Sequence, residues 1–279
     1  MHLLKRLCFP ITDDHIHIDL VNGRGIEAAK DFKRAGGTHL FLVSKPSSSY
    51  GITPRSGEAF EEVFQTTLKI AQLIRGIGLT VFPLLGVHPA EISRLCDSMP
   101  PWDAADIMKD ALDCAATHVL EGVAVGIKSG RPHYDVSEGI RTASNDVLLH
   151  ALTLGAECGC AVQVHAESGP CTDIVAMAEA VNMPISQVVK HFAIPETPLV
   201  PSLIARHDAI PKLCKSRRRF TMESDYMDEN SRPGAVIGPK SVPRFTYKLF
   251  ENGLITEEDV YRIHVTTPQT VYGIEIMLP

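Results

Sequence analysis

The sequence predicts an α/β protein that forms a single (β/α)8 barrel, the TIM-barrel architecture, over residues 1–279. Short apolar segments alternate with amphipathic ones about eight times along the chain, which is typical of βα units arranged around a parallel sheet. Histidine, lysine and aspartate residues stand at the ends of several expected strands, and barrels of this kind gather their functional residues at that end. We therefore expect parallel strands with a metal site at the carboxyl-terminal mouth.

The first four βα units follow one another without a linker. Apolar runs predict the strands, and a helical period predicts the helices, the first of which stops at the glycine pair Gly36-Gly37. The expected strands are residues 11–18, 39–45, 80–89 and 123–130, and the helices lie within 25–37, 56–78, 102–122 and 146–159.

The second half of the chain continues this alternation and then closes with two helices. The seventh strand, at residues 201–205, has the weakest pattern of the eight. The expected strands are residues 161–167, 188–193, 201–205 and 219–226, and the helices lie within 171–182, 209–216, 241–253 and 256–274.

Composition and charge narrow the class of protein. With 279 residues, of which 44% are hydrophobic, the chain can bury a core of barrel size. The net charge of −6 argues against a surface that coats long polyanions, although a local basic rim could still hold one phosphate group. A small-molecule or phosphoester substrate is therefore expected, and nucleic acid remains an option that the charge does not favour.

Cysteine usage and the amino-terminal residues indicate the compartment. Seven cysteines, an odd number without paired spacing, indicate free thiols in a reducing compartment, and the close pair Cys158 and Cys160 is interpreted as packing residues. The first residues lack the long apolar core of a signal peptide, and no apolar stretch reaches membrane-spanning length. We expect a cytoplasmic protein outside the membrane; its oligomeric state has no signal here.

Five residues at strand ends indicate a metal centre. A single histidine at such a place is more often a hydrogen-bonded core or surface residue. His15 and His17, however, are two apart on one strand and so point to the same face. Together they form a set of nitrogen and oxygen ligands suited to one or two zinc, manganese or related divalent ions. The set consists of His15, His17, His165, His191 and Asp225.

The chain resembles the amidohydrolase superfamily, and within it the TatD-related metal-dependent hydrolases. The segments that carry the resemblance are "DDHIHID", "GVHP", "VQVHAES", "KHFA", "MESDYMD" and "TPQTVYGI". In that superfamily a first-strand His-x-His, a fourth-strand Glu or Lys, histidines on strands five and six and an eighth-strand Asp bind one or two metals. The resemblance implies the same roles for the five residues above.

The fourth strand departs from the TatD pattern. TatD enzymes usually carry a metal-bridging glutamate there, whereas this chain has "GIKSGRPHY", which places Lys128 at that position. Other branches of the superfamily carry a lysine on this strand that reacts with carbon dioxide to form a bridging carbamate. Burial and nearby cations would favour the neutral amine that this reaction needs. The alternative is an ammonium paired with Asp225 or another acid, with a single metal or none.

Four further residues are candidates around the metals. His88 could hydrogen-bond the substrate or water, or it could shape the helix entry. Arg131 and His133 follow Lys128 and could bind an anionic substrate, or they could only shape the loop. Glu223 lies two residues before Asp225 and could orient a ligand. Weaker candidates, more in keeping with solvated loop charges, are Lys45, Glu167, Arg232 and Lys240.

These assignments predict hydrolysis by a metal-activated water, with Asp225 binding metal and moving the proton. The TatD resemblance implies phosphoester substrates, possibly DNA ends. Lys128 favours an alternative, a carbamate-dependent amidohydrolase acting on lactones, cyclic amides or phosphotriesters. A third, non-enzymatic possibility is a barrel that binds a metal or ligand without turnover. No Gly-x-Ser-x-Gly elbow or phosphate-cradling glycine loop occurs, so serine catalysis is not expected.

Overall fold

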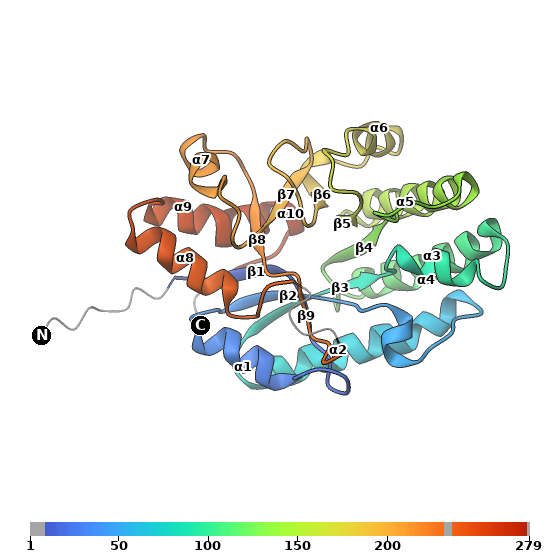
Figure 1. The fold of residues 1–279 in the computed structure, drawn as a ribbon, viewed down its shortest axis with the longest axis horizontal. Coiled ribbons are helices and arrows are strands. Elements are labelled where there is room, and N and C mark those ends of the chain that lie inside the picture. The colour runs from blue at the N-terminus through green and yellow to red at the C-terminus, as the bar shows by residue number, and fades with distance from the viewer. Residues whose placement is uncertain (1–8, 232–235, 278–279) are drawn as a thin grey trace, which may run out of the picture.

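The computed structural model describes residues 9–231 and 236–277, and they form an α/β fold around one curled parallel sheet. Its nine strands lie in the order β8-β7-β6-β5-β4-β3-β2-β1-β9 (Figure 1). The strands are β1 Thr12–His17, β2 His39–Val43, β3 Thr80–Gly86, β4 Gly126–Gly130, β5 Ala161–His165, β6 Val188–Lys190, β7 Val200–Ile204, β8 Thr221–Glu223 and β9 Tyr226–Met227.

Helices cover the outside of the curled sheet, with α8 and α9 toward one end of the molecule and α3, α4 and α5 toward the other (Figure 1). The α-helices are α1 Ile26–Arg34, α2 Glu61–Gly76, α3 Ala90–Leu95, α4 Pro101–Leu120, α5 Glu138–Cys158, α6 Asp173–Ala180, α7 Ile210–Lys215, α8 Ser241–Glu251, α9 Glu257–Tyr261 and α10 Thr267–Tyr272. Shorter turns are η1 Ser47–Tyr50, η2 Gly57–Phe60, η3 Ile185–Gln187 and the π-helical η4 Arg262–Thr266.

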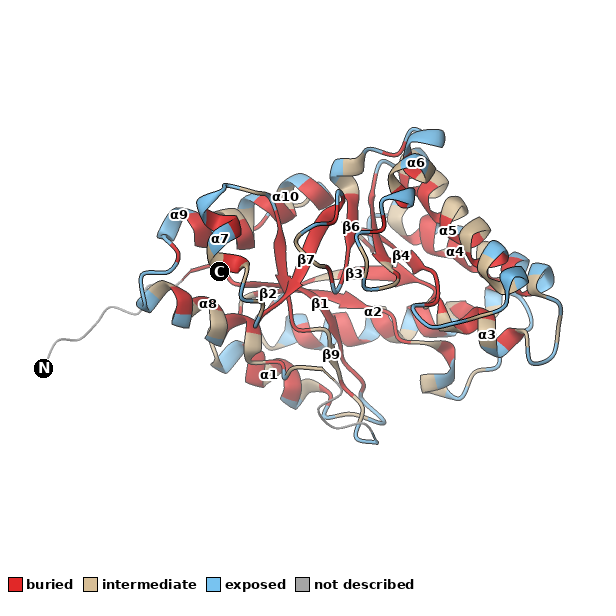
Figure 2. Cartoon of the chain, turned by 45° about the horizontal axis from the view of Figure 1, so that its top comes forward, coloured by how far each residue is buried: buried red, intermediate tan, exposed pale blue. Residues whose placement is uncertain are grey.

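The two faces of β2 show how the apolar pattern builds the core. Leu40 and Leu42 pack outward in a cluster that includes residues of α1 and α2. Phe41 and Val43 point the other way and pack with Tyr272 of α10 inside the curl. Figure 2 shows most of the strands buried, β9 half-buried, and the outer faces of the helices exposed. Both faces of the sheet are therefore covered, as expected for a parallel sheet.

The expected eighth strand, residues 219–226, is split in the structure. β8 pairs with β7, and β9 pairs with β1. Between them Asp225 has a φ of 45°, a left-handed conformation that a regular strand cannot contain. The backbone N–H of Asp225 donates to the carbonyl oxygen of His15 over 2.9 Å, which ties this break to β1. The sheet thus curls far enough for the first and last strands along the chain, β1 and β9, to pair.

One helix starts earlier than the sequence predicts, and the weakest expected strand is present. The helix expected within residues 146–159 begins earlier, at Glu138, after Ser137 accepts a hydrogen bond from the backbone N–H of Ile140. The added segment, about two helical turns, lacks a clear apolar stripe, and a side-chain cap rather than periodicity marks its start. The weak seventh strand is confirmed as β7.

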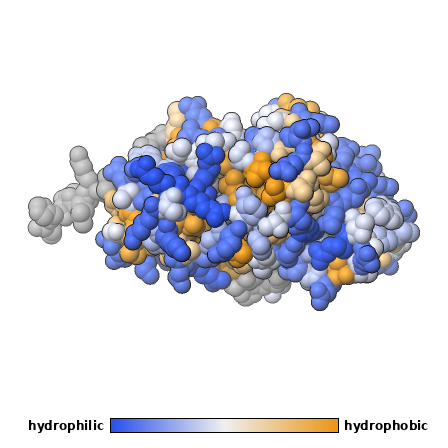
Figure 3. Space-filling model, turned by 90° about the horizontal axis from the view of Figure 1, so that it is seen from above, coloured by the Kyte–Doolittle hydropathy of each residue, from blue (hydrophilic) through white to orange (hydrophobic). Residues whose placement is uncertain are grey.

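The face in Figure 3 is mostly hydrophilic, with hydrophobic side chains in separate spots. Among the described residues no helix is both long and apolar enough to span a bilayer. The six cysteines within the described ranges are all free, and Cys8 lies outside those ranges.

Candidate metal centre

Side chains from four strand ends meet inside the curled sheet. His15 and His17 come from β1, and their Nε2 atoms are 3.0 Å apart. His165 ends β5 and His191 follows β6, and His165 Nδ1 lies 2.8 Å from His191 Nε2. Asp225, in the break between β8 and β9, brings Oδ1 to 3.6 Å from His15 Nε2. The five residues expected at a metal site therefore lie together.

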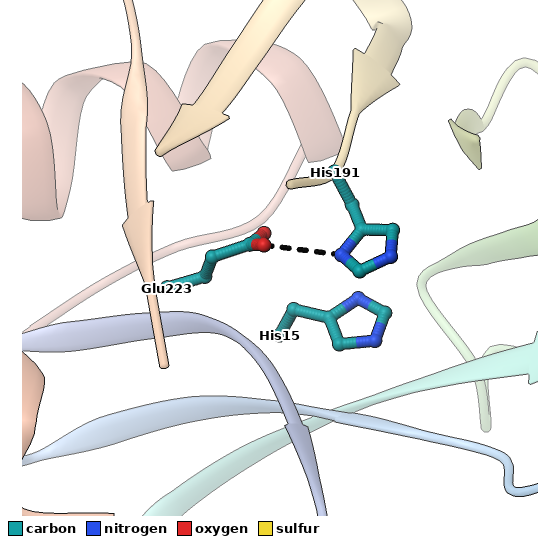
Figure 4. A group of neighbouring side chains, drawn as sticks. All are labelled: His15, His191 and Glu223. Atoms are coloured by element: carbon teal, nitrogen blue, oxygen red, sulfur yellow. Dashed lines mark hydrogen bonds and ion pairs between the residues drawn. The ribbon is translucent and has the colours of Figure 1, made fainter. Parts of the chain in front are cut away.

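His15 links two groups of possible ligands. Its ring stacks on that of His191, with ring centroids 4.0 Å apart (Figure 4). Glu223 of β8 points at His191, whose Nδ1 lies 3.0 Å from Glu223 Oε1. The ligand atoms of His15, His191 and Glu223 lie within 4.8 Å of one another, and so do those of His15, His17 and Asp225.

The hydrogen bonds of the two β1 imidazoles leave their metal-binding nitrogens facing each other. His17 Nδ1 lies 2.9 Å from the carbonyl oxygen of Val43, and His15 Nδ1 lies 2.5 Å from Gln163 Oε1. Because each Nδ1 faces an oxygen acceptor, it carries the hydrogen, and each Nε2 keeps a lone pair. Two such nitrogens bound to one zinc ion at about 2.0–2.1 Å would lie about 3.0–3.4 Å apart. The observed separation of 3.0 Å fits a shared divalent cation.

Lys128 lies on β4 beside this cluster and is only 1% exposed. Within the described part of the chain its Nζ has no hydrogen-bond partner. Burial lowers the pKa of Lys128 to about 7, against the opposing charges of Asp225 and Glu223. A charged amine without a hydrogen-bond acceptor is costly at such a place, so the neutral amine is favoured.

A glycine lets β4 and β5 approach closely where the site forms. Gly130, two residues after Lys128, has a φ of 153°, and a Cβ there would lie 1.8 Å from the carbonyl oxygen of His165. Any larger residue would push the two strand ends apart. The glycine in "KSGRP" therefore serves strand contact as well as the turn.

Burial favours the neutral forms of the acids at this site. It raises the pKa of Asp225 to about 7, against the opposing charge of Lys128. Burial, with the nearby charge of Asp225, also raises the pKa of Glu223 well above its usual value. A divalent cation beside these groups would reverse the shifts, because it favours the carboxylates.

The imidazoles are likewise held neutral, the form that binds metal ions. Burial lowers the pKa of His17 to about 3. Burial also lowers the pKa of four others well below the usual value, and Lys128 adds to the effect in each case whenever its amine is charged. These four are His15, His88, His165 and His191.

Two further histidines extend the cluster toward its opening. The half-buried His88 has its ring centroid 4.9 Å from that of His165, and its Nδ1 accepts from the backbone N–H of Ala90. His133 is exposed, and its Nδ1 lies 2.8 Å from His165 Nε2. His165 is therefore in contact with both residues expected near the substrate.

Arg131 is buried and engaged with carboxylates. Its Nε donates to Glu167 over 2.9 Å, and its Nη2 donates to Asp173 over 3.0 Å. Its Nη1 also donates to Asn145. These ion pairs raise the pKa of Arg131 against the effect of burial. The guanidinium thus joins the loop after β5 to the start of α6, and its donors are directed at protein oxygens.

The weaker rim candidates have varied surroundings. Lys45 was expected as a solvated loop charge, and this is wrong: it is 2% exposed and donates to Asp19 over 2.6 Å. Glu167 pairs with Arg131. Lys240 is part-exposed and lies 3.3 Å from Asp31. Arg232 lies outside the described residues.

Sequence reasoning missed Gln163, the hydrogen-bond partner of His15. Gln163 is fully buried in the middle of β5. A signal was available, because a polar residue interrupts the apolar strand "AVQVH" two positions before His165 and so faces the same way.

A curled parallel sheet that gathers imidazoles and carboxylates at its strand ends has the arrangement of a metal-dependent hydrolase of the TatD type. The chain belongs to the TatD family, since residues 12–273 match the family described as TatD related DNase.

The sequence and the fold are similar to those of other known proteins. The sequence is 36% identical over 290 residues to the uncharacterized protein MJ1127 of Methanocaldococcus jannaschii, with 100% of both chains covered. The fold is similar to that of YjjV, a TatD homolog from Escherichia coli K12, with a TM-score of 0.65, 15% identity and coverage of 95% and 98%. It is also similar to a mutant organophosphorus hydrolase from Deinococcus radiodurans, with a TM-score of 0.58, 14% identity and coverage of 95% and 93%.

Proposed function

We propose that this protein is a metal-dependent hydrolase of phosphoesters, DNA among them. The observation that carries the proposal is the pair of Nε2 lone pairs of His15 and His17, 3.0 Å apart and within reach of the Asp225 carboxylate. Together with TatD membership it supports a divalent ion, zinc or manganese, at this place. One or two ions would be held by His15, His17, Lys128, His165, His191 and Asp225.

A bound divalent ion would supply Lewis acidity and lower the pKa of water toward about 7. The protein's own groups then divide the remaining work. Asp225 accepts a proton on its carboxylate and returns it to the leaving group. Glu223 holds His191 through the Nδ1 hydrogen bond. His88 and His133, both next to His165, donate hydrogen bonds to the substrate from the open side.

Arg131 enters this proposal in a modified role. Its ion pairs with Glu167 and Asp173 support a role in ordering the loop that carries His133. In that role it shapes the anion-binding side of the site, and direct contact with substrate would require it to leave a carboxylate.

We extend the proposal to the fold: β8 and β9 form one interrupted eighth strand of a closed (β/α)8 barrel that spans the whole chain as one domain.

The surroundings of Lys128 support a carbamate. The neutral amine attacks the carbon of carbon dioxide and forms an N–C bond. The electron pair of one C=O bond moves to its oxygen, and the nitrogen releases one proton to solvent. The product is an anionic ligand with two oxygens, which would replace the missing TatD glutamate between two cations. The observation that favours this state is the buried Nζ, which has no hydrogen-bond partner among residues 9–231 and 236–277.

Labelling with carbon-13 dioxide tests the carbamate. We expect a carbamyl carbon signal in the metal-loaded protein, two metals per chain, and loss of the signal in Lys128→Met. Absence of the signal together with one metal per chain would reject the carbamate and leave the hydrolase proposal standing with a single ion.

A substrate panel tests the reaction. We expect metal-dependent cleavage of bis(p-nitrophenyl) phosphate and of short single-stranded oligonucleotides. Lys128 favours a second candidate, a carbamate-dependent hydrolase of lactones, cyclic amides or phosphotriesters, and the same panel includes these compounds. Preference for lactones or phosphotriesters over phosphodiesters would support the second candidate. Inertness toward all of them, despite bound metal, would indicate a ligand-binding barrel without turnover.

A further inference from the structure

We infer that Gln163 is a positioning residue that fixes the tautomer of His15 and so presents the His15 Nε2 lone pair to a divalent cation. This inference deepens the proposed function and rests on its metal site. It concerns a residue on β5, which lies across the curled sheet from β1 in the strand order. Which nitrogen of His15 carries the hydrogen depends on which way the Gln163 amide faces.

The hydrogen bonds on the nitrogen side of the amide decide its orientation. One group lies 2.9 Å from the main-chain carbonyl oxygen of Asp14 and 3.4 Å from Asp14 Oδ2. A carbonyl oxygen can only accept, so the group facing it is the NH2 of Gln163. The other end of the amide is then the oxygen, and it faces His15 Nδ1 at 2.5 Å. An amide oxygen also only accepts, so His15 Nδ1 must carry the hydrogen.

A neutral imidazole carries one ring hydrogen, and for His15 Gln163 holds it on Nδ1. Nε2 therefore keeps its lone pair, directed toward His17 Nε2 and Asp225. If the hydrogen were on Nε2 instead, the lone pair of Nδ1 would face the Gln163 oxygen. Nε2, which then carries the hydrogen, could not bind a metal ion. Gln163 thus does for His15 what the Val43 carbonyl oxygen does for His17.

The amide is itself held by a buried network. Gln163 Nε2 also donates to the Tyr272 hydroxyl over 3.1 Å, and that hydroxyl donates to Asp14 Oδ2 over 3.3 Å. Thr221 donates to the same Asp14 oxygen over 2.9 Å. Thr221 and Tyr272 thus donate to Asp14, and Gln163 donates to both Asp14 and Tyr272. No member of this network can turn without leaving a buried polar group unpaired.

An irregularity in β1 allows this arrangement. The pairing of β1 with β2 shifts register between Asp13 and Ile16, so that one extra residue is accommodated. Successive side chains of a regular strand face opposite ways. With the bulge, neighbouring Asp14 and His15 both reach Gln163. A carboxylate in place of the amide would face Asp14 without the NH2 donor, which explains a neutral side chain here.

Two measurements on the intact protein test the inference. Long-range ¹H–¹⁵N correlation of the imidazole rings in wild-type protein should show His15 with its hydrogen on Nδ1, assigned by comparison with His15→Gln. Competition with a chelator should show that Gln163→Met binds zinc about 10- to 100-fold more weakly than wild type. Tyr272→Phe is the matched control, because Asp14 still orients the amide, and its zinc affinity should stay within about threefold.

The outcomes separate this inference from the proposed function. Unchanged zinc affinity and an unchanged His15 tautomer in folded Gln163→Met would overturn the positioning role while metal binding by wild type still stood. Should Gln163→Met not fold, the wild-type ring spectrum decides: a hydrogen on His15 Nε2 rejects the inference, and one on Nδ1 supports it. Failure of wild type itself to bind zinc, manganese or other divalent ions would instead remove the proposed function.

Discussion

His15 and His17 meet through their Nε2 atoms, 3.0 Å apart, while their Nδ1 atoms both face oxygen acceptors. Two lone pairs at that distance repel each other, and a divalent cation would convert the repulsion into two ligand bonds. Because a bound divalent ion would remove this repulsion, metal binding should stabilise the folded chain.

Metal removal should lower stability, and His17→Ala should abolish the difference. At a free ion concentration 100 times the Kd, a single bound ion adds about 2.7 kcal/mol to the free energy of unfolding. Thermal unfolding with and without chelator measures this shift. The control is His150→Ala, whose histidine pairs with Asp113 on the surface and which should keep the shift. A metal-induced shift that survives in His17→Ala would contradict the assigned ligand.

Asp225→Asn should reduce kcat by about 10²- to 10⁴-fold with little loss of stability. The amide keeps the shape of the side chain but cannot accept and return the proton. Asparagine also tolerates the left-handed backbone at this position, where φ is 45°, so the variant separates chemistry from strain better than alanine does. Steady-state kinetics and urea denaturation give the two quantities. Full activity in the folded variant would exclude Asp225 as the proton acceptor.

Lys128→Met should leave the metal-free protein as stable as wild type, or about 1–3 kcal/mol more stable, because the buried Nζ has no hydrogen-bond partner among the described residues. The same variant should lose activity. Lys128→Glu supplies the carboxylate that TatD enzymes usually have, so it should be active without carbon dioxide. Assays in carbon-dioxide-depleted buffer compare the three proteins. Equal activity of wild type with and without carbon dioxide would argue against a carbamate.

Arg131→Gln should destabilise the protein by about 1–3 kcal/mol, since it leaves two partly exposed carboxylates without their ion pair. Urea denaturation measures the loss, and kinetics on bis(p-nitrophenyl) phosphate measure KM. We expect KM to change less than about threefold, because the guanidinium is already paired. A rise in KM of tenfold or more at unchanged stability would instead place Arg131 on the substrate.

The protein should lose stability as the pH falls from about 6.5 toward 3. His264 is fully buried between Thr12 and Thr246, and burial lowers its pKa from 6.5 to about 3. In that window the unfolded chain binds a proton that the folded chain does not, so stability is complete above pH 6.5. Each pH unit below it costs up to about 1.4 kcal/mol per such histidine.

The slope of stability against pH isolates this effect. Urea midpoints of metal-free protein between pH 4.5 and 7.5 should fall more steeply for wild type than for His264→Gln, whose side chain does not titrate. Identical slopes for wild type and His264→Gln would show that His264 is protonated in the folded state.

The sequence could predict much of the fold because periodicity is a local property. The apolar run 39–45 already places Leu40 and Leu42 on one face and Phe41 on the other, as in β2. It could not predict the split of the eighth strand, since the left-handed backbone at Asp225 depends on a hydrogen bond to β1 more than 200 residues away.

The candidate site, like the fold, has features that local sequence patterns predict and others that only long-range contacts decide. Alternation within one strand is enough to put His15 and His17 on the same face, and the strand ends bring His165, His191 and Asp225 near them. The hydrogen-bond partners of these residues do not follow from the sequence pattern, because the side chains involved meet only after the sheet curls. Gln163 reaches His15 over 148 residues, and Arg131 finds Glu167 and Asp173 instead of the open site.

The sequence alone therefore determined the class of fold and the kinds of atoms that gather at its strand ends, since both depend on patterns within a few neighbouring residues. Only the tertiary structure decided which nitrogen of each imidazole is free, because that depends on the single acceptor that long-range packing places against the other nitrogen.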